Sequence, residues 1–333
     1  MFRVALVSRW HLHAQKPDER YTKEFLKQAD CKIVCVWDEH PEIAAEWAKE
    51  LNVPAEKSLD ALLTRADVDG IIVTSATAEH KRIMLAAAKA GKHIFTEKAL
   101  AFTVEDAEEI RRAVRESGVK FCISFPHIAT RRFAYARTLL ENGTLGDPVM
   151  FRCLNGHRGG LNGDLPEYWF DPDICGGGAM MDLGCHPAYL AQYILGHAKS
   201  VSSSFSYYLG RRVEDNASCN VMYENGTMGV LESTFTSQLL GVYEMAVYGT
   251  KGTYYARLAD YQSELALIGQ PVKKIPDEEI PSAGMTPMER WISACTKGTE
   301  IKDCGIDEAV ELVKLMVAAY ESDRENGRRV TIG

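Results

Sequence analysis

The chain has 333 residues, of which 46% are hydrophobic and 25% are charged, as in folded proteins of about two domains. Its formal net charge of -8 disfavours nucleic acid as a partner. The sequence contains no run of 18 or more apolar residues, so no membrane span is expected. The N-terminus does not resemble a signal peptide, and nine cysteines without a Cys-x-x-Cys pair indicate reduced thiols. We therefore expect a cytoplasmic protein with no nucleic-acid or membrane partner.

Residues 1–125 alternate between short apolar runs and segments of helical period. The predicted strands span 2–7, 32–37, 69–74, 93–96 and 119–124, and the predicted helices span 18–28, 41–51, 78–90 and 103–117. In the last of these helices Thr103 is the expected N-cap, and Gly118 marks the end. Strands that alternate with helices in this way predict an α/β domain with a doubly wound parallel sheet of the Rossmann type.

The pattern changes after residue 125. We expect helices at 131–142, 179–195 and 307–325, a strand at 147–155, a glycine-rich loop at 158–178 and antiparallel strands between 200 and 255. This order predicts an α+β domain with a large, mostly antiparallel open sheet. The predicted domains are 1–124 for a dinucleotide, 125–304 for substrate binding and oligomerisation, and 305–333 for a C-terminal helix and strand.

Four segments carry a family resemblance that extends from end to end. They are DGIIVTSATAEHKRIMLAAAKAGKHIFTEKAL (69–100), ENGTLGDPVMFR (141–152), WFDPDICGGGAMMDLGCHPAYLAQYILG (169–196) and AVELVKLMVAAYESDRENGRRVTI (309–332). In this order they resemble the Gfo/Idh/MocA family of NAD(P)-dependent oxidoreductases, which includes glucose-fructose oxidoreductase and inositol dehydrogenase. The resemblance implies hydride transfer between NAD and a hydroxyl carbon of a sugar, inositol or related polyol. It also implies that the C-terminal helix returns to the first domain and that the large sheet joins subunits into a homodimer or homotetramer.

Glu97 and Lys98 follow the predicted strand at 93–96. In an open α/β sheet the ligand crevice lies beyond the carboxyl ends of the strands. A lysine there would hold a substrate hydroxyl and favour its alkoxide, whereas the alternative is a solvated lysine at a strand end. The resemblance assigns the catalytic role to Lys98, and we expect Glu97 beside it to contact the cofactor. Ala99 stands where the family usually has proline.

Asp182 and His186 are four residues apart on a predicted helix, so they would share one face. Histidine suits acid–base work because its pKa lies near working pH; the alternative is a surface ion pair. The resemblance makes His186 the base that takes the hydroxyl proton and Asp182 its orienting partner. Glycines 176–178 would let a backbone approach the sugar or nicotinamide closely. Tyr189 stands where many family members have aspartate.

The segment after the first strand, SRWHLHA (8–14), lacks all three glycines of the family's Gly-x-Gly-x-x-Gly motif, which holds the pyrophosphate of a dinucleotide. In one interpretation the dinucleotide still binds, with Ser8 in the turn, Arg9 or the histidines on its phosphates and Trp10 against the ribose. In the other, His11 and His13 serve a different ligand. A metal ion on these two histidines is not expected, because no companion ligand pattern is visible.

Asp38 ends the second predicted strand, where an acidic residue accepts ribose hydroxyls and repels a 2′-phosphate. It therefore predicts NAD, with NADP less expected; the alternative is an aspartate that caps the next helix. Ser75-Ala76-Thr77 stands where the family usually has Thr-Pro-Asn, and His80 keeps the family's histidine. Ser75, Thr77 and His80 are further candidates for cofactor contacts, although His80 would equally sit within its helix.

Four residues are candidate substrate contacts, since they follow predicted strand ends or lie in the loop that faces the crevice: His127, His157, Arg158 and Trp169. Trp169 matches a recurrent tryptophan of the family and would pack on a sugar face. Two alternatives to dehydrogenation stay open. One is redox-neutral glycoside cleavage through transient oxidation by tightly bound NAD, and the other is a non-catalytic sugar- or dinucleotide-binding regulatory protein.

Overall fold

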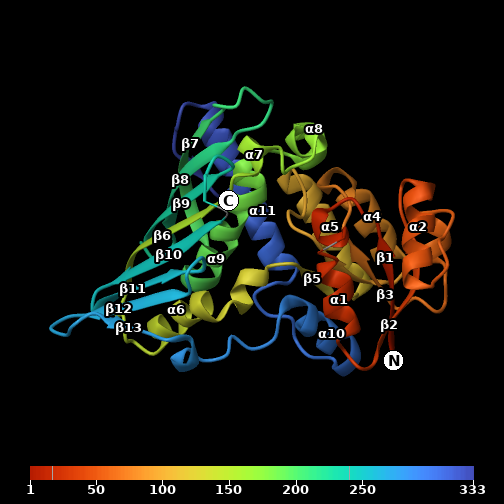
Figure 1. Ribbon diagram of the computed structural model, residues 1–333, viewed down its shortest axis with the longest axis horizontal. Coiled ribbons are helices and arrows are strands. Elements are labelled where there is room, and N and C mark those ends of the chain that lie inside the picture. Colours follow the sequence, from red (N-terminus) through yellow and green to blue (C-terminus); the bar gives the residue numbers. More distant parts are fainter. Residues whose placement is uncertain (17, 240) are drawn as a thin grey trace. The chain divides into compact units, whose positions relative to one another are not determined.

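The computed structural model describes residues 1–16, 18–239 and 241–333. The chain divides into two compact units, whose elements Figure 1 labels. Unit 1 comprises Met1–Ser124 and Met285–Val310, and unit 2 comprises Phe125–Gly284 and Glu311–Gly333. None of the described helices combines the length and the apolar character that a membrane crossing requires.

A parallel sheet with the strand order β2-β1-β3-β4-β5 forms the centre of unit 1. Its strands are β1 (Phe2–Val7), β2 (Cys31–Trp37), β3 (Gly70–Val73), β4 (His93–Thr96) and β5 (Phe121–Ile123). They are nearly continuous runs of buried residues, as expected for a sheet covered on both faces. The strand order reverses between β1 and β3, and in doubly wound folds the ligand crevice lies beyond the carboxyl ends of the strands at this point. The predicted Rossmann-type sheet is thus confirmed.

The helices of unit 1 follow the predicted alternation. They are α1 (Arg20–Leu26), α2 (Pro41–Leu51), α3 (Leu59–Leu63), α4 (Thr77–Lys89), α5 (Val104–Ser117) and α10 (Pro287–Lys297), with a 3₁₀ turn η1 (Leu12–Ala14) after β1. Thr103 caps α5 as expected, because its hydroxyl accepts the Asp106 N–H at 3.1 Å. The short helix α3 was not predicted from the sequence.

Residues 285–304 belong to unit 1, whereas the sequence analysis assigned them to the second domain. The reason is the packing of α10. The Trp291 ring lies 5.1 Å from Phe2 and 5.7 Å from Phe95, and its indole N–H donates to the Lys120 carbonyl at 3.3 Å. These partners are distant in sequence, so local pattern did not indicate them.

A nine-stranded sheet organises unit 2, in the order β13-β12-β11-β10-β6-β9-β8-β7-β14. Its strands are β6 (Pro148–Gly156), β7 (Ala198–Ser206), β8 (Asn216–Tyr223), β9 (Met228–Thr234), β10 (Val242–Gly249), β11 (Gly252–Arg257), β12 (Gln262–Leu267), β13 (Lys273–Lys274) and β14 (Val330–Thr331). Neighbouring strands are antiparallel except β6 and β9, which are parallel. The expected large, mostly antiparallel sheet is therefore confirmed.

The helices of unit 2 are α6 (Arg131–Glu141), α7 (Gly159–Asn162), α8 (Pro172–Cys175), α9 (Cys185–Leu195) and α11 (Ile306–Arg324), whose residues from Glu311 onward belong to this unit. Of these, α6 packs on β10 and β11, and α9 packs on β6 and β9 (Figure 1). Three 3₁₀ turns accompany them, η2 (Pro126–Ala129), η3 (Glu167–Phe170) and η5 (Asp277–Glu279). The helix predicted at 179–195 is in fact a turn of π-helix, η4 (Met180–Gly184), that continues into α9.

Candidate active site

The carboxyl edge of the unit 1 sheet gathers the predicted cofactor residues. Because all five strands are parallel, the segments that follow them lie along one edge. The loop after β1 carries Ser8 to His13, Asp38 follows β2, Ser75 follows β3, and Glu97 and Lys98 follow β4.

The loop after β1 keeps only part of the geometry that a glycine motif would have. Ser8 has a φ of 63°, the left-handed value that the first turn requires. The His11 N–H donates to the Thr74 carbonyl at 2.9 Å, and the chain then forms η1. Since α1 begins only at Arg20, the loop does not lead directly into a helix N-terminus, which is what binds pyrophosphate in the glycine motif.

The Arg9 side chain is engaged within the protein. Its guanidinium donates to Glu19 at 3.0 Å and to Glu50 at 2.8 Å, and it lies 5.6 Å from the centre of the Trp47 ring. Two carboxylates neutralise its charge, so the structure gives no support to the predicted contact between Arg9 and a phosphate.

Asp38 joins the loops that follow β1 and β2. Its carboxylate accepts the Arg9 N–H at 2.6 Å and the His40 N–H at 2.8 Å, and the residue is 5% exposed. The alternative of an aspartate that caps α2 is wrong, because His40 occupies the N-cap position of that helix. Asp38 instead stands at the sheet edge, with a carboxylate held in place by two backbone amides.

The turn between β3 and α4 offers a polar group suited to a ligand. The Ser75 hydroxyl is buried and has no hydrogen-bond partner among the described residues, and Thr77 opens α4. A buried hydroxyl without a partner at the switch point fits a polar ligand such as a dinucleotide. His80 is fully buried, with its Nδ1 3.2 Å from the Leu100 carbonyl, and burial lowers its pKa. It therefore packs inside the unit, beneath the segment that follows Lys98.

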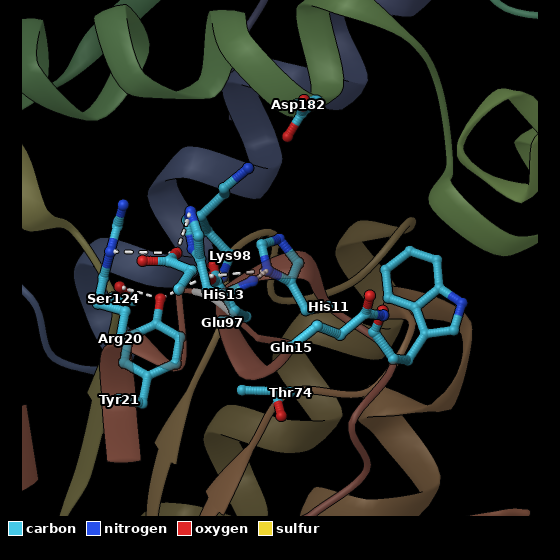
Figure 2. Close-up of polar contacts among 12 residues, drawn as sticks. His11, His13, Gln15, Arg20, Tyr21, Thr74, Glu97, Lys98, Ser124 and Asp182 are labelled. Atoms are coloured by element: carbon cyan, nitrogen blue, oxygen red, sulfur yellow. Dashed lines mark hydrogen bonds and ion pairs between the residues drawn. The ribbon is translucent and has the colours of Figure 1, made fainter. Parts of the chain in front are cut away.

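Five side chains from four separate segments form what we call the loop cluster: His11, His13, Tyr21, Glu97 and Ser124 (Figure 2). Glu97 Oε1 lies 2.7 Å from His13 Nδ1 and 3.5 Å from His11 Nδ1, and it accepts the Tyr21 hydroxyl. The Tyr21 and Ser124 hydroxyl oxygens are 2.8 Å apart. The cluster places a carboxylate that is almost fully buried at the centre of a polar network.

Burial alone would keep Glu97 protonated, but the groups around it outweigh this effect. Histidines 11 and 13 and the Lys98 ammonium together hold the pKa of Glu97 well below its usual range. Burial, and next to it the Glu97 charge, raise the pKa of Tyr21 well above its usual value, so its hydroxyl stays a donor. Lys98 is 7% exposed, its amide donates to Glu97 Oε2 at 2.9 Å, and its peptide bond to Ala99 is cis.

In unit 2, His186 lies among aromatic side chains at the start of α9. Its Nδ1 is 3.0 Å from the Tyr189 hydroxyl, which also accepts the His127 N–H at 3.1 Å. The rings of His127 and His186 are 5.0 Å apart, and Tyr189 stacks on Phe125 at 4.2 Å. The structure thus brings His127 and His186 together. Tyr189, which replaces an aspartate of the family, bonds directly to the imidazole.

Asp182 lies on the π turn η4 and is held by Trp169. The indole N–H of Trp169 donates to Asp182 Oδ2 at 3.2 Å, and the tryptophan is only 5% exposed. The predicted packing of this indole on a sugar face thus gains no support, since it is largely buried and bonds to the carboxylate. Because a π turn separates them, Asp182 and His186 do not sit one turn apart on a regular α-helix.

Glycines 177 and 178 face protein atoms and not a ligand. A Cβ on Gly177 would collide with the Tyr320 hydroxyl, and one on Gly178 would collide with the Glu214 carbonyl. The Glu214 carboxylate is 1% exposed and accepts the Gly178 N–H at 3.0 Å, the Met180 N–H at 2.8 Å and the Tyr320 hydroxyl at 2.7 Å. The glycines therefore serve the close packing that anchors η4, which corrects their interpretation as a ligand approach.

His157 and Arg158, the other predicted substrate contacts, form a separate group after β6. The His157 ring stacks on Phe235 at 5.3 Å, and its Nδ1 accepts the Gly159 N–H at 3.0 Å. Arg158 Nε lies 3.6 Å from Asp164. These contacts hold the two side chains in place and give no support to the predicted substrate contacts.

Four residues that contribute to these groups were not identified from the sequence: Tyr21, Ser124, Glu214 and Tyr320. Ser124 stood there only as the last residue of a predicted strand. Tyr21 and Tyr320 lie on helices whose period marks them only as core positions. Glu214 stands just before a strand in a charged segment, RRVED, which looks solvent-exposed. Only the fold brings them to their partners, so no local signal was available.

Two family models match this chain. The model of the oxidoreductase family with an NAD-binding Rossmann fold covers residues 13–125, and the model of the GFO/IDH/MocA C-terminal domain covers residues 133–255. The first match begins at His13, so β1 and most of the loop without glycine lie outside it.

The individual relatives described next are 20–29% identical to this chain. The uncharacterized oxidoreductase YrbE of Bacillus subtilis is 29% identical over 198 residues, which cover 58% of this chain and 56% of that protein. The 1,5-anhydro-D-fructose reductase of Ensifer adhaerens is 28% identical over 230 residues, or 68% of each chain. Levoglucosan dehydrogenase, solved in complex with NADH and levoglucosan, superposes with a TM-score of 0.87 over 99% of both chains at 20% identity, which shows the shared fold.

The two family matches fall one in each unit, and together they cover most of the chain. The resemblance seen in the sequence is thereby confirmed: this chain belongs to the Gfo/Idh/MocA family of oxidoreductases, whose first domain is an NAD-binding Rossmann fold.

Proposed function

We propose that the protein transfers a hydride between NAD and a hydroxyl-bearing carbon of a sugar, inositol or related polyol. The observation that carries this proposal is Lys98, a lysine that follows β4 at the edge where a doubly wound sheet binds its ligand. The names 1,5-anhydro-D-fructose reductase and levoglucosan dehydrogenase support a carbohydrate substrate.

NAD, when bound, supplies the hydride acceptor. His186 takes the proton of the substrate hydroxyl while the C–O bond becomes a carbonyl. Lys98 stabilises the negative charge that develops on this oxygen as the proton leaves. Asp182 completes the set as the orienting carboxylate, and its own position depends on the indole of Trp169. We expect His127, whose ring lies 5.0 Å from that of His186, to contact a substrate hydroxyl.

The test is turnover of polyols and sugars with NAD by Lys98→Met and His186→Asn variants, with the exposed Lys89→Met as control. Each site variant should lose about 100-fold or more in kcat while it keeps the wild-type unfolding midpoint. Full activity in both would refute the assigned roles. Product formation without release of NADH would refute net oxidation and favour the redox-neutral scheme.

Asp38 supports NAD as the cofactor in preference to NADP, since its fixed carboxylate would repel a 2′-phosphate. Titration of the purified protein with both dinucleotides should show tighter binding of NAD, and Asp38→Ser should narrow the difference. If neither dinucleotide binds, the regulatory alternative replaces this proposal.

A second copy of the chain is the partner that we propose for the outer face of the unit 2 sheet. Half-buried apolar side chains lie there, among them Met150 and Leu154, beside the ion pair of Arg152 and Glu232 at 2.8 Å. Large sheets of this kind commonly bury such a face in symmetric association. A solution mass of only 37.0 kDa, that of one chain, would contradict it.

A further inference from the structure

The loop cluster joins two imidazoles and a carboxylate in a way that the proposed hydride transfer does not require. One nitrogen from each of His11 and His13 and one oxygen of Glu97 all lie within 4.8 Å of one another, and this is the only such trio found in the described residues. We propose that His11, His13 and Glu97 bind a divalent transition-metal ion of the zinc class.

The facing atoms of the cluster call for a cation between them. His11 Nδ1 accepts the His13 N–H at 3.1 Å, so this nitrogen carries a lone pair and not a proton. It nevertheless lies 3.5 Å from Glu97 Oε1, which is also an acceptor. Two lone pairs that face each other inside a protein repel, and a cation bound to both atoms would turn this repulsion into attraction. A metal ion needs these very forms, a neutral imidazole and an ionised carboxylate. To bind the ion, His11 Nδ1 would give up its hydrogen bond from the His13 N–H.

The spacing of the atoms suits a small ion. Zinc bonds of about 2.0–2.2 Å at tetrahedral angles place neighbouring ligand atoms about 3.3–3.5 Å apart. The separation of His11 Nδ1 from Glu97 Oε1 already has this value. The 2.7 Å contact between His13 Nδ1 and Glu97 would have to open by about 0.6–0.8 Å. The His13 side chain can make this adjustment, since it is 24% exposed, against 7% for His11 and 2% for Glu97.

Supporting contacts orient the carboxylate as they do in known metal centres. The Tyr21 hydroxyl donates to Glu97 Oε1, and the Lys98 N–H donates to Oε2 at 2.9 Å. Outer hydrogen bonds of this kind hold a ligating carboxylate in one orientation. Two histidines and a glutamate leave the fourth position of a tetrahedral ion open. That position would take an oxygen donor, either a phosphate of the cofactor or a hydroxyl of the substrate.

The experiment is titration of the full chain, stripped with a chelator, first with Co²⁺ alone and then with Zn²⁺ in competition. One equivalent of Co²⁺ should give the visible bands of a tetrahedral nitrogen and oxygen site, without the sulfur charge-transfer band that binding to cysteine would produce. His11→Ala and His13→Ala should each lose about 100-fold in affinity, and Tyr21→Phe about 10-fold. His40→Ala, which removes a side chain that is 67% exposed, should bind as the wild type does.

Absence of stoichiometric Co²⁺ binding, or unchanged binding by His11→Ala and His13→Ala, would overturn the site. Substitution of the buried Glu97, as in Glu97→Gln, would also test the site if that variant folds. Because His13 is partly exposed, His13→Ala should fold in any case, and its affinity for Co²⁺ then tests the site. A spectral change on addition of NAD would assign the open position to cofactor phosphate, and a change only with a polyol would assign it to substrate. No change with either would refute the open position. Metal binding is measured without turnover, so its failure would leave the hydride-transfer proposal intact.

Discussion

Glu214→Gln should loosen the π turn that carries Asp182. The Glu214 carboxylate accepts two backbone N–H groups of this turn, those of Gly178 and Met180, and the Tyr320 hydroxyl. Glutamine keeps the volume of the side chain but turns one acceptor into a donor. All three donors bond to Oε1, and the Gly178 N–H also bonds to Oε2, so the new amide group faces the Gly178 N–H and is left as a buried donor without an acceptor. The remaining bonds lose their charge.

An unsatisfied buried donor costs about 1–3 kcal/mol, and a bond to a charged group exceeds a neutral one by about 1 kcal/mol. Relief from burying a charge offsets the loss of charge in these bonds, so the buried donor without an acceptor decides the outcome, and we expect Glu214→Gln to lower the free energy of unfolding by about 1–3 kcal/mol. For a unit of this size the melting temperature should fall by roughly 5–10 °C. kcat should fall as well, because Asp182 moves with the turn.

The pH dependence has a definite sign. Burial raises the pKa of Glu214, and its hydrogen bonds only partly counter this. The folded protein therefore keeps this proton to a higher pH than the unfolded chain does. Its stabilising contribution is complete below the unfolded pKa and is lost as the pH rises through the folded pKa. The gap in melting temperature between wild type and Glu214→Gln should thus be wider at acidic than at neutral pH.

Thermal unfolding followed by calorimetry between acidic and neutral pH measures both effects. Glu224→Gln is the matched control, because that glutamate is exposed on the turn between β8 and β9. If Glu214→Gln has the same melting temperature as the wild type and this control, the carboxylate does not anchor η4 and the reasoning fails. A gap that widens with rising pH would refute the sign.

Two further substitutions probe the same unit. Gly178→Ala places a methyl group against the Glu214 carbonyl and should cost about 1–3 kcal/mol by overpacking, whereas Gly241→Ala, with open space around it, should not; denaturant midpoints compare them. Tyr189→Phe removes the hydroxyl that bonds His186 Nδ1 and accepts the His127 N–H, so the pH profile of kcat/KM should shift and the melting temperature should also fall; an unchanged profile would exclude Tyr189 from tuning this base.

The fold was predictable where local chemistry dictates it. Alternating apolar runs and helical periods indicated the parallel sheet, and Thr103 marked the start of α5. The π turn was not predictable, because nearly every position around it is buried, so an extra residue in the turn leaves no break in the pattern. Residues 285–304 were misassigned for another reason: Trp291 packs on Phe2, at the opposite end of the sequence.

The candidate site was predictable residue by residue but not as groups. Lysine at a strand end and histidine on a helix are local features. The meeting of His11 and His13 with Glu97, however, follows from the parallel sheet, which ends β1 and β4 at the same edge. Glu214 reaches the glycines at 176–178 through the antiparallel sheet in the same way. Spacing along the chain therefore gave no indication that the Glu97 carboxylate lies beside the two histidines.

The loop after β1 shows how a dinucleotide crevice can be rebuilt without glycine. A left-handed residue that carries a Cβ costs about 1–2 kcal/mol, and the turn that follows β1 accepts this cost at Ser8. Fixed partners offset it: the Ser8 N–H donates to the Trp37 carbonyl at 2.8 Å, and the Arg9 N–H donates to Asp38 at 2.6 Å. The loop is thus held by its own strands before any phosphate arrives. It follows that its polar side chains, and not a row of glycine amides, must supply whatever attraction the pyrophosphate receives here.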